Sequence, residues 1–236
     1  MRVFAISDLH LSLAENKPMD IFDRVWENYM DRIRENWIKA VNDDDLVLIP
    51  GDISWATYIE NSAPDFLYLE ALPGKKIISK GNHDYWWTTH SKLNKFKESL
   101  SLNSIAFLHN NAFFYGSLAI VGTRGWKNPE DEDFSAEDEK IYNRELERLK
   151  ISLKLTENFG GTKIAMLHYP PFSARGNPTG FVDIMKNYGV NICIYGHLHG
   201  KSSNSATEGE IDGIRYHLVS ADYLKFEPLY LGEWLT

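Results

Sequence analysis

Short apolar runs rich in branched side chains recur along the chain. Seven of them cover residues 3–7, 46–50, 76–79, 104–108, 118–121, 163–167 and 191–195. Each run is apolar nearly throughout, without the regular alternation of polar and apolar residues, and this pattern is typical of strands covered on both faces. The sequence therefore predicts β-structure buried between other layers.

Helical patterns separate the early strands. Phe22, Trp26, Tyr29, Ile33, Trp37 and Ala40 follow one another at steps of three or four. That spacing places them on one face of a helix. Pro64 begins a second predicted helix, which ends near residues 73–74. A third, long helix is predicted from Ser135, where Asp138 completes a capping-box pattern, through Lys154.

The alternation of strands and helices predicts an α/β fold with parallel strands joined by right-handed crossovers. The last quarter of the chain differs, because residues 213–220 and 228–231 have the pattern of strands joined by turns and predict antiparallel pairing. The 236-residue sequence contains no internal repeat, low-complexity tract or flexible linker. Residues 1–236 are therefore expected to form one domain.

Composition limits the classes of protein that fit. Hydrophobic residues make up 43% and charged residues 25%, as in ordinary globular proteins. The net charge of -8 gives no general attraction for long nucleic acid or an anionic membrane. The single cysteine, Cys193, excludes an internal disulfide and is expected to be a small buried hydrophobe. With no membrane-spanning run and no signal peptide, a cytoplasmic location and no membrane partner are expected.

Metal-capable side chains follow five of the predicted strands. They are Asp8 and His10, Asp52, Asn82 with His83 and Asp84, His168, and His197 with His199. Each fragment alone is more often a cap, a turn or a structural histidine. Together they are informative, because ligands of parallel α/β sheets bind beyond the carboxyl ends of the strands, where all five groups can meet. Imidazoles, carboxylates and an amide suit divalent ions such as manganese, iron, zinc or cobalt.

This set of residues resembles the calcineurin-like metallophosphoesterase superfamily. Its pattern of Asp-x-His, Gly-Asp, Gly-Asn-His-(Asp or Glu), His and Gly-His-x-His occurs in order between Asp8 and His199. The resemblance implies a four-layer α/β/β/α sandwich with two mixed β-sheets flanked by helices. It also implies two metal ions, one bound by Asp8, His10, Asp52 and His199 and the other by Asp52, Asn82, His168 and His197. Asp52 would bridge them.

The activity implied by the resemblance is hydrolysis of a phosphate ester. Two bridged ions would acidify a water, and the resulting hydroxide would attack phosphorus. His83 is expected to stabilise the transition state or to protonate the leaving oxygen. Asp84 would either support His83 or cap the following helix. Arg124 and Arg175 are candidates for binding the substrate phosphate, with a plain surface position as the simpler interpretation.

Departures from the pattern narrow the substrate class. Asp52 is followed by Ile53 and Ser54, whereas protein serine/threonine phosphatases continue with Asp-Arg-Gly. His83 stands where relatives that cleave lipid-linked sugar pyrophosphates usually carry arginine. A small phosphodiester or phosphomonoester remains the expected substrate and partner. A non-catalytic metal-binding scaffold and a nuclease are the alternatives. The sequence leaves open the identity of the metal (Mn, Fe, Zn, Ni or Co) and the oligomeric state.

Overall fold

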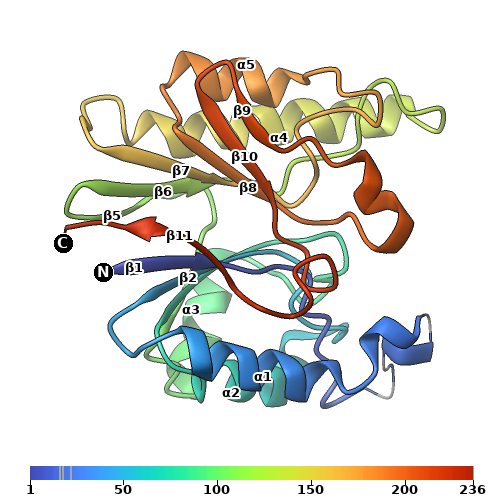
Figure 1. Cartoon of the computed structure of the whole chain (residues 1–236), viewed down its shortest axis with the longest axis vertical. Helices are drawn as coiled ribbons and strands as arrows, with labels where there is room; N and C mark the ends of the chain where they lie inside the picture. The colour runs from blue at the N-terminus through green and yellow to red at the C-terminus, as the bar shows by residue number, and fades with distance from the viewer. Residues whose placement is uncertain (16, 18, 22, 236) are drawn as a thin grey trace.

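A computed structural model describes residues 1–15, 17, 19–21 and 23–235. Two β-sheets pack against each other between two layers of helices, which is the four-layer sandwich expected from the sequence (Figure 1). Helices α1, α2 and α3 cover one outer face, and α4 and α5 cover the other. Their bounds are Tyr29–Ala40, Ala63–Glu70, His90–Ser99, Ala136–Lys154 and Gly180–Asn187. Among the described residues, no helix is both long and apolar enough to cross a lipid bilayer.

The first sheet has the strand order β11-β1-β2-β3-β4. These strands span Leu229–Glu233, Arg2–Ala5, Leu46–Pro50, Lys75–Ser79 and Ile105–Phe107. β1 to β4 are mutually parallel, while β11 runs antiparallel to β1 at the edge. This pairing of the first and last strands brings the two chain ends together (Figure 1).

The second sheet has the order β5-β6-β7-β8-β10-β9. These strands span Phe113–Tyr115, Leu118–Gly122, Thr162–Met166, Ile192–Tyr195, Ile214–Leu218 and Gly209–Ile211. The four central strands are parallel, and β5 and β9 are antiparallel edges. Both sheets are therefore mixed, and each has a parallel centre whose strands end at one edge.

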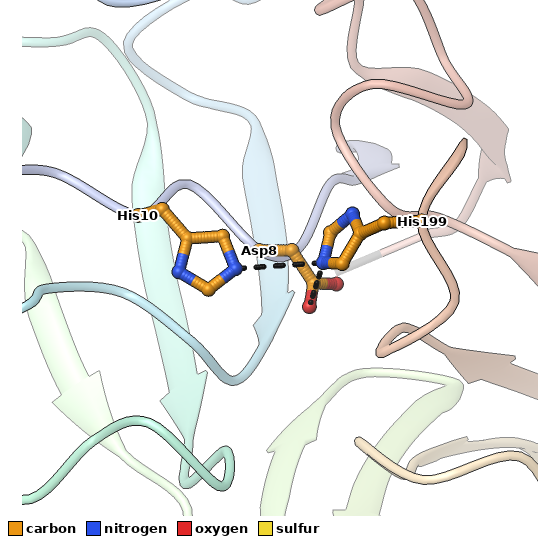
Figure 2. Close-up of side chains that lie close together, drawn as sticks. All are labelled: Asp8, His10 and His199. Atoms are coloured by element: carbon orange, nitrogen blue, oxygen red, sulfur yellow. Dashed lines mark hydrogen bonds and ion pairs between the residues drawn. The ribbon is translucent and has the colours of Figure 1, made fainter. Parts of the chain in front are cut away.

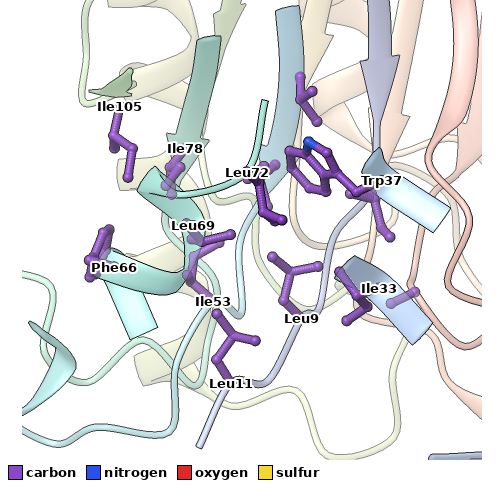
Figure 3. Packing of buried hydrophobic residues seen from close by; sticks show 14 of the residues in the cluster. Leu9, Leu11, Ile33, Trp37, Ile53, Phe66, Leu69, Leu72, Ile78 and Ile105 are labelled. Atoms are coloured by element: carbon purple, nitrogen blue, oxygen red, sulfur yellow. The ribbon is translucent and has the colours of Figure 1, made fainter. Parts of the chain in front are cut away.

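Burial on both faces explains the continuous apolar runs. Along β2, Leu46 and Leu48 pack into the core between the two sheets, while Val47 and Ile49 pack against the helices of the first layer. Figure 3 shows this second core, which includes Trp37 of α1, Phe66 of α2 and Ile78 of β3. Successive strand residues point to opposite faces, so a strand with a core on each side has no position for exposed polar residues.

Two predictions about local structure need correction. The helix expected to include Trp26 begins only at Tyr29, because Asn28 has a left-handed backbone (φ 52°) that interrupts it, and Trp26 lies in a separate 3-10 turn. Phe22 lies outside the described residues. Antiparallel pairing does occur in the last quarter, but residues 213–220 and 228–231 contribute to different sheets. β10 pairs with β8 and β9, whereas β11 crosses to β1.

Candidate metal centre

The seven predicted ligands lie on loops that follow β1, β2 and β3 in the first sheet and β7 and β8 in the second. The backbone of several of these loops is unusual. Asp8, His10, Asp52 and His197 have φ angles of 58°, 45°, 53° and 72°. Non-glycine residues rarely adopt this left-handed conformation, and it concentrates at functional sites, where surrounding structure holds the strain. The sharp turns redirect these side chains at the ends of the strands.

Glycines let the carboxylates pack against bare backbone. A Cβ atom at Gly81 would lie 2.1 Å from Oδ1 of Asp52, and one at Gly196 would lie 2.2 Å from Oδ2 of Asp8. Neither position has room for a side chain. The glycines next to Asn82 and His197 in the sequence are therefore required by close approach of the aspartates of neighbouring loops.

Asp8, His10 and His199 form the first group of candidate ligands (Figure 2). Nε2 of His199 lies 3.1 Å from Oδ1 of Asp8 and 3.4 Å from Nε2 of His10. One ligand atom from each of the three residues lies within 4.8 Å of the others. Asp52 is close to this group as well, since its Oδ2 lies 3.8 Å from Nε2 of His10.

The second group surrounds His168. Its Nε2 lies 2.6 Å from Oδ1 of Asn82 and 3.4 Å from Oδ2 of Asp52. The same Asn82 oxygen is 2.8 Å from Nδ1 of His197. Because Oδ2 of Asp52 contacts histidines of both groups, Asp52 lies between them. The structure thus brings all seven predicted ligand side chains together at one place.

The donor atoms fit divalent metal ions in both spacing and charge. Ligands at about 2.0–2.2 Å from a tetrahedral ion are roughly 3.3–3.6 Å apart, close to the 3.1 and 3.4 Å of the first group. The 2.6 and 2.8 Å separations around Asn82 are shorter, and an ion between these atoms would widen them. Burial opposes the charged form of His199, yet Asp8 and Asp222 outweigh it and raise its pKa to about 10. Asp52 and Asp8 likewise overcome burial and raise the pKa of His168 to about 9. The carboxylates that raise these two pKa values would also attract metal cations, which displace the protons.

Two of the histidines have their ring orientation fixed by neighbours. Nδ1 of His168 lies 3.0 Å from the carbonyl oxygen of Pro50, which can only accept, so Nδ1 donates. Nε2 therefore faces Asn82 and Asp52, and it would bind a metal ion after losing its proton. Nδ1 of His199 lies 2.7 Å from Oδ1 of Asp222, and Oδ2 of Asp222 accepts from the backbone N–H of Gly200 at 2.9 Å. Partners of this kind fix the tautomer of a metal-binding histidine.

Asp222 is a site residue that the sequence analysis missed. It follows β10, a strand that had been predicted from residues 213–220, and its side chain is almost fully buried. The strand-end rule that identified the other residues applies to this strand as well. The sequence predicted antiparallel pairing for residues 213–220, and only the structure shows that β10 runs parallel to β8, so this signal could not be used.

His83 lies beside the cluster, as expected. Its ring centroid is 4.7 Å from that of Trp55 and 5.6 Å from that of His10, and its backbone N–H donates to Oδ1 of Asp52 at 2.8 Å. Burial lowers the pKa of His83. Within the described residues, Nδ1 of this ring has no hydrogen-bond partner. The imidazole is therefore next to the candidate ligands without being tied to another side chain.

Asp84 has a different role from either one predicted. Its carboxylate accepts hydrogen bonds from the backbone N–H groups of Asp52, Ile53 and Gly81, at 2.9, 2.8 and 2.7 Å, and from the indole of Trp86 at 3.0 Å. None of its hydrogen bonds within the described residues goes to the ring of His83 or to the first turn of a helix. Asp84 is fully buried and ties the loop after β2 to the loop after β3. Asp84 therefore neither caps a helix nor orients the His83 ring by a hydrogen bond, and an effect of its charge on His83 stays a prediction.

The two predicted arginines lie in different surroundings. Arg124 is mostly buried, with its guanidinium 4.2 Å from the centroid of the Trp126 ring and its NH2 3.4 Å from Glu145. Its backbone carbonyl accepts from the N–H of His168 at 2.9 Å, so it adjoins the cluster. Arg175 is exposed, and the described residues show no contact between it and the candidate ligands. Only Arg124 is placed next to the site.

A cavity of about 420 Å³ opens beside the cluster. Asn82 and His197 form part of its wall, and the aromatic side chains of Trp126, Tyr169 and Phe172 line it further out. The rings of Tyr169 and His197 are 4.2 Å apart, which connects the aromatic wall to a candidate ligand. The cavity is large enough for a small molecule and has the mixed apolar and polar lining typical of ligand sites.

Comparisons with known proteins agree with this geometry. The calcineurin-like phosphoesterase family profile matches residues 1–201. No curated protein sequence matches the chain significantly.

Solved structures share the fold at low sequence identity. Phosphopantetheinyl hydrolase from Mycobacterium tuberculosis is 13% identical with a TM-score of 0.61, covering 98% of this chain and 95% of that one. A protein of unknown function from Aquifex aeolicus is 17% identical with a TM-score of 0.51, covering 97% and 95%. GAP50, the anchor in the inner membrane complex of Plasmodium, is 13% identical with a TM-score of 0.51, covering 94% and 72%. Likeness at this level concerns the fold alone.

Proposed function

This chain belongs to the calcineurin-like phosphoesterase family, and on that premise we propose that it hydrolyses a small phosphodiester or phosphomonoester with two divalent metal ions. The observation that carries the proposal is the convergence of seven side chains from five strand ends into two linked groups. Histidine, carboxylate and amide donors at these spacings suit transition-metal dications.

The residues that would hold the ions divide between the two groups. Asp8, His10, Asp52 and His199 would bind one, and Asp52, Asn82, His168 and His197 the other. When bound, such ions supply Lewis acidity toward phosphate oxygens and lower the pKa of a coordinated water toward neutrality. Asp52 is positioned to serve both, because its Oδ2 lies 3.8 Å from Nε2 of His10 and 3.4 Å from Nε2 of His168.

His83 would act on the leaving group. Its ring is half-buried beside His10, and the packing of Trp55 against both imidazoles fixes their relative positions. An imidazole in this position can donate a proton or a hydrogen bond to the departing oxygen, an effect typically worth about 10²- to 10⁴-fold in rate. Asp84 supports this geometry indirectly, since it holds the backbone of Asp52 and Gly81 in place.

The aromatic cavity would receive the organic part of the substrate. Trp126 and Tyr169 have ring centroids 5.3 Å apart and together form an apolar wall next to His197. The charge of Lys127 at the rim is paired with Asp133. Asp131 also lines the cavity and gives it a net negative charge, so this cavity favours an uncharged, flat or branched part of the substrate over a polyanion.

The alternative function, a non-catalytic scaffold, has a precedent in this fold, because GAP50 is described as an anchor and shares the fold. Fold alone therefore decides nothing about catalysis. What supports hydrolysis here is that each ligand type of the family pattern is kept and that the side chains meet in space. The nuclease alternative receives less support, since the net charge of -8 disfavours long nucleic acid.

The test is metal reconstitution followed by turnover. The protein is stripped of metal and restored with manganese, iron, zinc or nickel singly. Hydrolysis of an aryl phosphate monoester is then compared with that of a bis-aryl phosphate diester. At least one ion should restore turnover in the wild type and in the surface control His90→Ala, while His83→Ala keeps the metal and loses rate. Absence of turnover with all four ions and both ester classes would contradict the proposal.

A further inference from the structure

A second cavity, of about 370 Å³, lies at the carboxyl ends of β3 and β6. Arg124 forms part of its wall, while the guanidinium of the same residue stacks on Trp126, which lines the aromatic cavity. The new cavity contains none of the candidate metal ligands. Arg124 therefore lies between two cavities: the aromatic cavity next to the cluster and a second cavity with a different chemistry.

Positive charge dominates the lining of this second cavity. Lys80, Arg124 and Arg148 contribute cations, and Glu145 contributes the one carboxylate. Three positive groups and one negative group leave two positive charges facing a confined space. This is unusual in a chain whose net charge is -8. Like charges held together in a partly buried cavity repel one another, and an anion would relieve that repulsion.

The carboxylate of Glu145 makes polar contacts with three neighbouring side chains. It is completely buried, accepts a hydrogen bond from the hydroxyl of Thr123, and binds NH1 of Arg148 at 2.7 Å and NH2 of Arg124 at 3.4 Å. The carboxylate thus orients both guanidinium groups and leaves their remaining N–H groups for another partner. Nε of Arg124 is buried and has no hydrogen-bond partner in the described part of the chain. Lys80 forms no ion pair with any described residue.

We propose that this cavity binds a phosphate group other than the one that is hydrolysed. A terminal phosphate carries about -1.5 to -2 charge at pH 7, which matches the excess charge of the cavity, and a carboxylate would balance only part of it. Arginine forks bind phosphate oxygens in pairs with good geometry. Thr88 and Thr89 also line the cavity, and their hydroxyl groups can donate hydrogen bonds to phosphate oxygens.

The position of the cavity links it to the candidate metal centre. Lys80 directly precedes Gly81 and Asn82, and the carbonyl of Arg124 accepts from the N–H of His168 at 2.9 Å. Two sources of the phosphate fit this position: a second phosphate on the substrate, or free inorganic phosphate. The first source rests on the proposed hydrolysis, whereas binding of the phosphate group itself does not.

Binding is tested without metal, so that the candidate metal centre cannot account for it. Inorganic phosphate is titrated into the chelator-treated protein by calorimetry at constant ionic strength. Saturable binding is expected, with affinity reduced on the order of tenfold or more in Arg148→Gln and in Lys80→Gln. Arg144→Gln is the matched control, because Arg144 is exposed on the same helix and outside the cavity. Thermal melting checks that each variant is folded.

The outcomes separate this inference from the proposed hydrolysis. The inference is overturned if the folded wild-type protein binds no phosphate. It is also overturned if Arg144→Gln weakens phosphate binding as much as the two cavity variants do. Both results are independent of whether the metal-loaded protein hydrolyses esters. The source is decided with the metal-loaded protein and a series of linear diols, as bisphosphates and as monophosphates. If the phosphate belongs to the substrate, Arg148→Gln raises KM for bisphosphates on the order of tenfold more than for monophosphates. If Arg148→Gln changes KM equally for bisphosphates and monophosphates, while the wild-type protein binds inorganic phosphate, the ligand of the cavity is free phosphate.

Discussion

The two sheets contribute different chemistry to the same site. The first sheet supplies both carboxylates and the amide, from Asp8, Asp52 and Asn82, together with His10. The second sheet supplies imidazoles alone, from His168, His197 and His199. Neither half could hold two cations by itself. The complete set of candidate ligands exists only while the sheets are packed through their shared apolar core, so metal binding at this site would be thermodynamically linked to sheet packing.

The halves also differ in rigidity. Asp8, His10 and Asp52 of the first sheet all have left-handed backbones, and their side chains are at most 3% exposed. In the second sheet His197 also has a left-handed backbone and His168 is fully buried, but the side chain of His199 is 28% exposed. Substitutions in the first half should therefore disturb folding as well as metal binding. Substitutions that affect the partly exposed His199 should act mainly on metal affinity.

The largest effect is expected for Asp52→Asn. Asp52 lies between the two ligand groups, and loss of its charge removes an anion from both. We expect kcat/KM to fall by at least about 10³-fold, because charge stabilisation in the transition state depends on both ions. Steady-state kinetics measure the loss, and Asp43→Asn, an exposed aspartate, is the control. An Asp52→Asn protein with near wild-type turnover would show that the first sheet does not supply the essential charge.

His83→Ala is expected to separate rate from metal binding. His83 belongs to the first sheet's loops but makes no contribution to the ligand groups. Loss of its imidazole should lower kcat by about 10²- to 10³-fold, with metal content unchanged. Kinetics and metal analysis on the same sample test this. If metal content fell together with the rate, His83 would belong with the ligands.

Gly81→Ala tests the rigidity of the first half. An added Cβ would lie 2.1 Å from Oδ1 of Asp52, so the loop or the carboxylate must shift. We expect a loss of about 1–3 kcal/mol in the free energy of unfolding, together with weaker metal binding. Gly160→Ala is the matched control, since no atom lies within 4 Å of the added carbon there. Denaturant unfolding that gave equal stabilities for the two variants would remove the case for a tightly packed first half.

Asp222→Asn probes the second half. Asp222 holds Nδ1 of His199 at 2.7 Å, and an asparagine can keep a hydrogen bond while losing the charge. Metal affinity should weaken on the order of tenfold, with only a small fall in the midpoint of unfolding of the metal-free protein, because Asp8 still helps to stabilise the charge of His199. Competition with a chromogenic chelator measures the affinity. A large drop in stability of the metal-free protein would instead assign Asp222 to folding.

Local signals in the sequence were sufficient for many elements and insufficient for others. The strand over residues 46–50 and the long helix with its Ser135 capping box were predicted with their observed bounds, because their signals lie within the segment itself. Helices α3 and α5 and the three-residue edge strands β5 and β9 were not predicted, since short segments carry weak periodicity. The backbone of Asn28, which shortens α1, has no distinctive signal.

In the candidate site, too, local sequence signals predicted some residues and could not predict others. Strand ends identified the ligand candidates, because the carboxyl ends of parallel strands meet at one edge. The role of Asp84 could not be predicted, as it depends on the loop after β2 lying against the loop after β3. The second cavity joins Lys80 of one sheet to Arg124 of the other. Contacts between residues distant in sequence exist only after the sheets pack.

The central claim, that the two halves together hold two cations, is tested most directly by counting metal ions. Wild-type protein and Asp52→Asn are saturated with manganese, desalted and analysed by mass spectrometry for metal per chain. The account predicts about two ions per wild-type chain and a marked loss in the variant. A folded wild-type protein that retains no ions, or an Asp52→Asn protein that retains the same number, would contradict it.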